Sequence, residues 1–100
     1  MEMDVLLSAL GNKTRYQLIK AMKEKAIVSC CGKLDFFENG VSVGDAVKFT
    51  GLAQSTVSQH LAVLEKAGLI RKEKRDLWSC YFLNEEAMKS FLMQLKQDML

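Results

Sequence analysis

The chain has 100 residues, of which 49% are hydrophobic and 26% charged; this is the make-up of a globular domain and excludes a disordered chain. The formal net charge of +2 is too small to indicate nucleic-acid binding by itself, so the distribution of charges must decide that question. We expect residues 1–100 to form one domain, without a secretory signal or a hydrophobic run long enough to span a membrane.

The first quarter of the sequence predicts two helices. Met3, Leu6, Leu7 and Leu10 recur at helical spacing, and Gly11 ends this helix. Asn12 is suited to cap a second helix over about Lys13–Lys25. Leu18, Ile19 and Met22 are its expected buried face. Its expected solvent face carries Lys13, Arg15, Lys20, Lys23 and Lys25.

Residues 26–40 show no sustained periodicity, and a connection of this length in a compact domain is usually functional. Two short helices follow. Ser42 caps the first, which runs through Phe49, and Thr50-Gly51 makes a tight turn into the second, over about Gln54–Ala67. Gly68 is a natural stop for that helix.

The last third predicts a hairpin and a final helix. Leu69–Lys74 and Trp78–Leu83 have the composition of strands, with a turn at Arg75-Asp76 between them. A helix begins at about Asn84. The order of elements predicts a mostly α-helical fold with a small β-hairpin wing, which is a winged helix-turn-helix.

The helix over Gln54–Ala67 has one face suited to reading DNA. With Val57, Leu61 and Leu64 turned inward, its outward residues are Ser55, Ser58, Gln59, Ala62 and Lys66. Short hydroxyl and amide side chains without acids suit a helix in the major groove. An ordinary polar surface helix is the alternative interpretation.

The hairpin that follows carries four cations within five residues, Arg71, Lys72, Lys74 and Arg75, against Glu73. Such a hairpin next to a recognition helix is placed to contact the phosphates that flank the groove. Charge for solubility is the alternative.

Three segments carry a resemblance to a known family: Leu10–Arg15, Ser55–Leu61 and Leu64–Ile70. In this order they resemble the ArsR/SmtB family of winged-helix repressors, over roughly Val5–Leu95. The resemblance implies a homodimer built from the first and last helices, which binds a palindromic double-stranded DNA operator and is released by an effector. It places DNA contacts on Ser55, Thr56, Ser58, Gln59 and His60, and on a wing over Lys72–Trp78. The wing turn lacks the glycine common in the family, which leaves its shape open.

The terminal helices support a dimer independently of the resemblance, because their hydrophobic stripes exceed what so small a core needs. The expected interface residues are Leu6, Leu7, Leu10, Phe91, Leu92, Leu95 and Met99. Packing of these stripes within one monomer is the alternative.

The family's metal sites are absent: residues 84–100 contain no histidine, and Val41–Asp45 contains no cysteine. The candidates for sensing are the three cysteines, Cys30, Cys31 and Cys80. This odd set is a poor disulfide framework and favours a reducing, cytoplasmic location. If residues 26–40 cover the second strand, the three thiols would meet, as a site for a soft ion such as As(III) or as a redox pair. Purely structural cysteines are the alternative.

Two other functions compete with DNA-binding regulation. Cys80 and His60 could be imagined as nucleophile and base, but the fold should separate them and no third orienting group is evident, so an enzyme is not expected. A winged helix that binds DNA without an effector, or that binds protein, remains the alternative. The sequence therefore predicts a DNA-binding transcriptional regulator, a repressor released by an effector.

Overall fold

The computed structural model describes residues 2–27, 40–75 and 78–100. The described residues form, in order, α1 (Met3–Leu10), α2 (Lys13–Glu24), α3 (Val43–Thr50), α4 (Gln54–Lys66), β1 (Ile70–Arg75), β2 (Trp78–Leu83) and α5 (Glu85–Met99). This confirms the expected mostly helical fold with a hairpin wing, with element ends within a residue or two of those predicted. No helix in these ranges is long and apolar enough to cross a membrane.

Side-chain caps fix where several helices begin. Asn12 Oδ1 accepts from the Arg15 backbone N–H at 3.1 Å, and Asn84 Oδ1 accepts from that of Ala87 at 3.2 Å. At α3, Ser42 Oγ accepts from the Asp45 N–H at 3.1 Å, while Asp45 Oδ2 accepts from the Ser42 N–H at 3.0 Å. Ser42 and Asp45 thus form a reciprocal capping box, and this box fixes the start of α3, the first helix of the helix-turn-helix.

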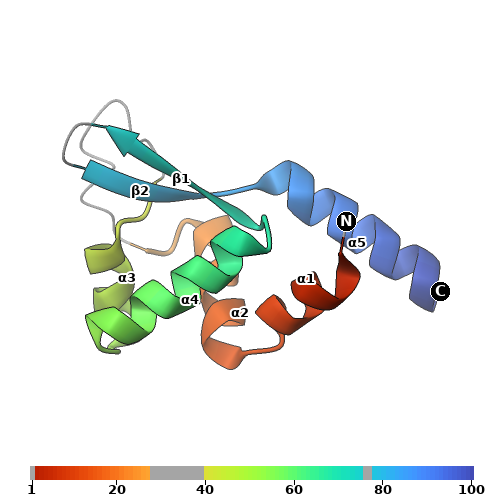
Figure 1. Cartoon of the computed structure of the whole chain (residues 1–100), viewed down its shortest axis with the longest axis horizontal. Helices are drawn as coiled ribbons and strands as arrows, with labels where there is room; N and C mark the ends of the chain where they lie inside the picture. Colours follow the sequence, from red (N-terminus) through yellow and green to blue (C-terminus); the bar gives the residue numbers. More distant parts are fainter. Residues whose placement is uncertain (1, 28–39, 76–77) are drawn as a thin grey trace.

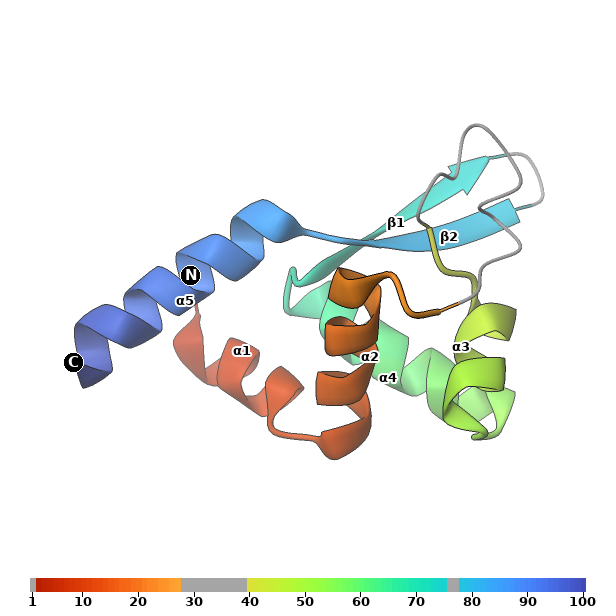
Figure 2. The same ribbon diagram turned by 180° about the vertical axis from the view of Figure 1, so that it is seen from behind.

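The core is centred on α4. Val57, Leu61 and Leu64 have no exposed surface, which confirms the inward face predicted for this helix. Gly51 and Gly68, both in the left-handed region with φ of +73° and +85°, bracket the helix and let the chain turn sharply at each end. Figures 1 and 2 show α4 central, with α2 and α3 beside it, the hairpin along one side and α5 projecting from the body.

The hairpin pairs β1 with β2 in antiparallel register, from Ile70 opposite Leu83 to Arg75 opposite Trp78. The outer edge of β2 is also occupied, because Val41 exchanges both backbone hydrogen bonds with Tyr81, at 2.9 and 2.8 Å. The preceding residue, Gly40, packs closely on this strand: a Cβ there would lie 3.0 Å from Cys80 Cβ and 2.8 Å from the Phe82 ring, so a larger residue would require these side chains to shift. The chain entering α3 therefore packs directly on β2.

Ser42→Ala should lower the free energy of unfolding by about 1 kcal/mol, because the Asp45 N–H loses its acceptor at the start of α3. Urea denaturation at one fixed protein concentration measures the change. Ser8→Ala, at an exposed position within α1, is the matched control and should leave stability nearly unchanged. Equal midpoints for Ser42→Ala and the parent would show that the capping box does not stabilise the helix-turn-helix.

Candidate nucleic-acid interface

The solvent face of α4 has the residues that the sequence predicted. Ser55, Ser58, Gln59, Ala62 and Lys66 are all exposed, and Thr56 and His60 are half-buried at its flanks. No side chain caps the first turn of α4, so its free N–H groups and positive helix end can also bind an anion.

His60 does not stand alone, because Arg15 of α2 reaches it. The Arg15 guanidinium Nη1 lies 3.1 Å from His60 Nδ1, while Nε donates to the Ala9 carbonyl at 2.7 Å. Arg15 is half-buried in this position, so its prediction as a solvent-face residue is wrong. Burial of the ring, and secondly the positive charge of Arg15, lower the pKa of His60 below its ordinary value of 6.5. Both effects favour the neutral form of the His60 ring at pH 7.

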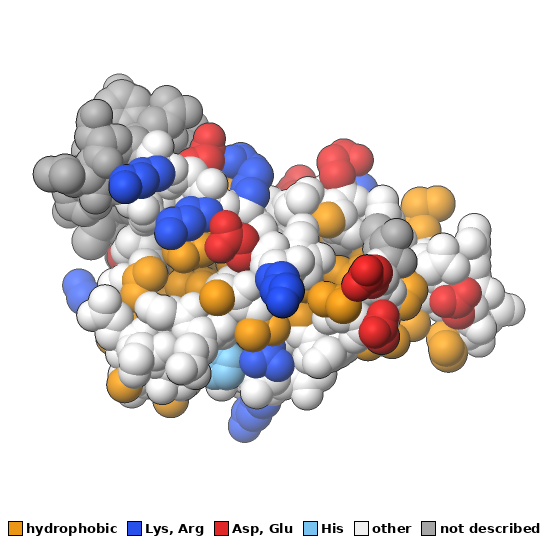
Figure 3. Space-filling model, viewed as in Figure 1, with side chains coloured by type: hydrophobic (Ala, Val, Ile, Leu, Met, Phe, Trp, Pro, Cys, Tyr) orange, Lys and Arg blue, Asp and Glu red, His pale blue; other side chains and the backbone are white. Residues whose placement is uncertain are grey.

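The cationic side chains of the hairpin differ in how closely neighbouring side chains contact them. Arg71 forms an ion pair with Glu73 at 2.9 Å and lies 4.6 Å from the centre of the Phe82 ring. Lys72 and Lys74 are exposed, and Lys72 Nζ lies 5.9 Å from the Tyr81 ring. Figure 3 shows Lys and Arg side chains over the hairpin, while the surface over α3 and the first half of α4 is mostly uncharged. The Arg75 side chain lies outside the described residues.

The terminal helices divide their hydrophobic stripes between core and surface. Leu6 and Phe91 are only 3% exposed within the single chain, so they belong to its own core, which corrects their assignment to a dimer surface. Leu7, Leu92 and Met99 are 47%, 53% and 70% exposed. Leu10 and Leu95 are half-buried. Met93 and Leu100 are exposed as well and were not among the residues predicted for the interface.

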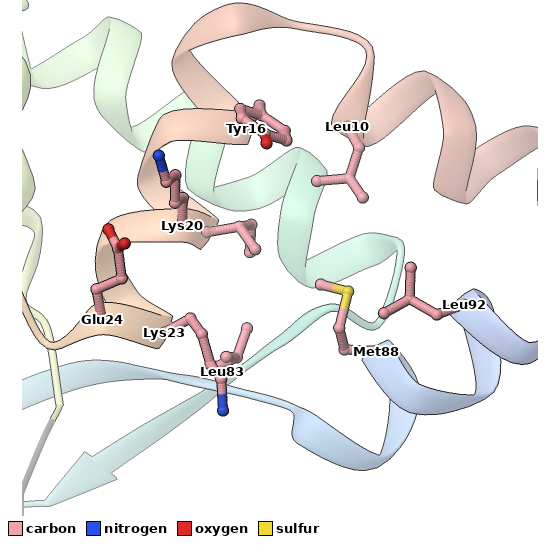
Figure 4. Close-up of a pocket in the computed structure, with 9 residues that line it drawn as sticks. Leu10, Tyr16, Lys20, Lys23, Glu24, Leu83, Met88 and Leu92 are labelled. Atoms are coloured by element: carbon pink, nitrogen blue, oxygen red, sulfur yellow. The ribbon is translucent and has the colours of Figure 1, made fainter.

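A cavity of about 390 Å³ lies between α2 and α5 (Figure 4). Its wall is mostly apolar, with two lysines and a glutamate on the α2 side. The lining residues are Leu10, Tyr16, Ile19, Lys20, Lys23, Glu24, Leu83, Met88 and Leu92. Sequence reasoning missed this cavity, because it depends on how α5 leaves β2. Leu92 both lines the cavity and is exposed, so the cavity adjoins the apolar surface of α5.

The cysteines are only partly described. Cys80 is fully buried in β2 and is disulfide-bonded. Cys30 and Cys31 lie outside the described residues, so the predicted meeting of three thiols stays a prediction. Within the described ranges, no three His, Cys, Asp or Glu side chains gather into a group that could hold a metal ion.

Comparison with known proteins places this architecture in a family. Residues 38–72 match the family model for bacterial regulatory proteins of the arsR family. The chain is 32% identical to YbzH, an uncharacterized HTH-type transcriptional regulator of Bacillus subtilis, covering 98% of this chain and 99% of YbzH. It is 33% identical to the transcriptional activator HlyU of Vibrio cholerae, covering 88% of this chain and 68% of HlyU.

One further relative is matched less completely, and one of the relatives above has a solved structure. The chain is 36% identical over 76 residues to ArsR2 of Halobacterium salinarum, which is 76% of this chain but 54% of the length of that protein. A solved structure of HlyU, 33% identical, superimposes with a TM-score of 0.58 over 91% of this chain and 87% of its own.

The fold is shared still more widely. A crystal structure of the ArsR family transcriptional regulator RHA00566, at 17% identity, reaches a TM-score of 0.73 and covers 97% of this chain and 92% of its own. With an exposed recognition helix, a cationic hairpin and relatives of this similarity, the chain belongs to the ArsR family of DNA-binding transcriptional regulators.

Proposed function

We propose that this regulator is a cytoplasmic homodimer that represses transcription from a palindromic operator and leaves it when its thiols change state. The observation that carries the proposal is the exposed face of α4, which has no acidic residue before Glu65 and lies next to a cationic hairpin. Both elements are anchored in one core, so they would approach DNA as a unit.

Base reading falls to the middle of the α4 face. Gln59 can form a bidentate pair with an adenine edge in the major groove, and Ser55 and Ser58 can bond to bases or phosphates. Thr56 and His60, at the flank of the helix, are placed for the sugar-phosphate wall of the groove. This division of labour assigns specificity to Gln59 above all.

Phosphate contact falls to the hairpin. Lys72 and Lys74 are exposed, and each phosphate they neutralise would release counterions. The positive charge of Arg71 is partly offset by its ion pair with Glu73, so we expect a smaller share from it. The proposed wing also includes Arg75.

A second copy of the chain would complete the hydrophobic packing of α5. Phe91 is the one residue of this 15-residue helix that is buried in the single chain. Leu7, Leu92 and Met99 expose much of their apolar surface, and Leu10 and Leu95 are partly exposed. A two-fold axis near α1 and α5 would cover this surface and set two α4 helices about one DNA turn apart.

We propose the cysteines as the sensing element. Cys80 is disulfide-bonded, and Cys30 and Cys31 are the only other cysteines of the chain. With peroxide as oxidant, two thiols and one peroxide give one disulfide and two waters. Because Gly40 contacts Cys80 where the chain enters α3, a bond formed there would act on both the wing and the helix-turn-helix.

A soft ion such as As(III) is the second candidate effector. One relative, at 28% identity, is the arsenical resistance operon repressor of Bacillus subtilis. A thiolate site for As(III) would need Cys80 in its reduced form together with Cys30 and Cys31. Oxidation and As(III) binding would therefore compete for the same sulfurs.

Gln59→Ala should weaken binding to the operator by about 1–3 kcal/mol and hardly affect binding to random DNA. Lys74→Ala should weaken both and lower the slope of log K against log salt by about one unit. The probe is a duplex selected from a random library by the parent protein, and anisotropy titrations at several salt concentrations measure both effects. Lys89→Ala, an exposed cation on α5, is the control. A uniform loss for Gln59→Ala would show that it does not read bases.

Leu92→Asp should convert the dimer to a folded monomer, because Leu92 is 53% exposed and the substitution buries no charge in the monomer core. Ser90→Asp adds the same charge at an exposed site about 160° away around α5 and should remain dimeric. Sedimentation velocity at micromolar concentration measures the mass of each. A monomeric parent protein would refute the dimer.

Peroxide or As(III) should weaken operator binding by the parent and not by Cys80→Ala. Alanine is preferred to serine at this fully buried site, since an unpaired hydroxyl there would cost about 1–3 kcal/mol. The double variant Cys30→Ser/Cys31→Ser removes the two thiols that we propose as partners of Cys80. Thiol counting before and after peroxide accompanies the titrations. If the parent responds to neither reagent, the cysteines are structural.

A further inference from the structure

Arg15 joins three elements through one side chain. It lies in the first turn of α2, where its backbone N–H donates to the side chain of Asn12, the N-cap residue. Its guanidinium donates to two carbonyls at the end of α1, Ala9 at 2.7 Å and Ser8 at 3.3 Å. The remaining arm reaches His60 on α4 at 3.1 Å. The α1 carbonyls thus fix the guanidinium, and the guanidinium meets the ring from a defined direction.

The chemistry of this contact determines which nitrogen of His60 carries the proton. A guanidinium has only donors and does not lose its proton in proteins. Nδ1 must therefore be the acceptor, and a neutral ring bonded in this way carries its proton on Nε2. Arg15 thus selects a ring whose second nitrogen is a donor.

That donor is accessible. Among the described residues, no buried side-chain nitrogen or oxygen lacks a hydrogen-bond partner. The His60 ring is hydrogen-bonded through Nδ1, and the residue is only half-buried, so Nε2 reaches solvent. His60 follows Gln59 and is therefore about 100° around α4 from it, on the flank and not in the middle of the exposed face. On a helix in the major groove, that flank faces the phosphate wall.

We infer that Arg15 is a positioning residue for DNA binding, which holds His60 as a neutral Nε2–H donor to a phosphate oxygen beside the major groove. This inference rests on the proposed function, since it assumes that α4 enters the groove. The nearby positive charge of Arg15 adds attraction for the phosphate without itself needing to touch it. Because the ring is neutral, the contact would contribute affinity without adding to counterion release.

Free protein provides the first test, because His60 is the only histidine and gives one set of imidazole signals. Nitrogen-15 NMR of the full, tag-free chain at neutral pH should show Nδ1 unprotonated and Nε2 protonated. In Arg15→Met the pKa of His60 should rise, because the neighbouring charge is lost, although burial still lowers it. A protonated Nδ1 in the parent, or an unchanged pKa in Arg15→Met, would overturn the inference.

Two isosteric variants then separate the two nitrogens in DNA binding. His60→Asn places an acceptor near the position of Nδ1 and keeps the Arg15 contact, but it has no donor at the position of Nε2. His60→Gln reverses this, with a donor near Nε2 and no Nδ1 acceptor. His60→Asn should bind operator and random DNA about tenfold more weakly, as for a lost bond to a charged group, with an unchanged salt slope. His60→Gln should lose less.

A double-mutant cycle shows whether Arg15 acts through His60. Arg15→Met alone should weaken DNA binding, and in the His60→Asn background it should add little further loss. Full additivity, or parent-like binding by His60→Asn, would refute the inference even if Gln59→Ala abolishes sequence preference as expected. Absence of any sequence-specific binding by the parent would instead refute the proposed function. The NMR test of the His60 tautomer does not depend on that outcome, because it uses free protein.

Discussion

Burial of one face of α4 is the constraint on which the other functional features depend. Val57, Leu61 and Leu64 have no exposed surface, and the helices α2 and α3 and the strand β1 pack around this helix. Truncating one of these side chains to alanine would cost about 2–5 kcal/mol, so the helix cannot rotate about its axis to suit a ligand. The direction of Ser55, Ser58 and Gln59 is therefore fixed before DNA arrives. A recognition helix that is also the central core helix is pre-organised for binding.

The second anchor of the proposed interface is the far edge of β2. A two-stranded hairpin alone is marginally stable, and here Val41 pairs with Tyr81 while Gly40 packs on Cys80 and Phe82. The wing is thereby attached to the chain just before Ser42, where the helix-turn-helix begins. A chemical change at Cys80 would therefore affect the position of both proposed DNA-binding elements. In this way the proposed thiol sensor would be coupled to operator binding through direct contacts.

The contact between Arg15 and His60 adds a third connection, from the end of α1 to the flank of α4. If α1 and α5 form the dimer interface, a shift of α1 in the dimer would be transmitted to α4 through the Arg15 side chain. α5 projects from the body, and its apolar side chains Leu92, Met93 and Met99 are exposed. In the proposed dimer, a second copy of the chain would cover these side chains.

The sequence by itself determined the elements and the outward face of α4. Helical periodicity placed Val57, Leu61 and Leu64 on one side, and the capping residues Asn12 and Ser42 marked helix starts, because these signals are local and depend on neighbours within one turn. The capping-box partner Asp45 was also available from its spacing to Ser42 and was missed.

Only the tertiary structure decided which hydrophobic residues of the terminal helices are already used in the core: Leu6 and Phe91 are buried, and Leu92 is not. Only the tertiary structure, too, turned Arg15 from an expected surface cation into the partner of His60, residues 45 positions apart. A side chain as long as arginine can reach several neighbours, and the approach of α1, α2 and α4 determines which of them it meets.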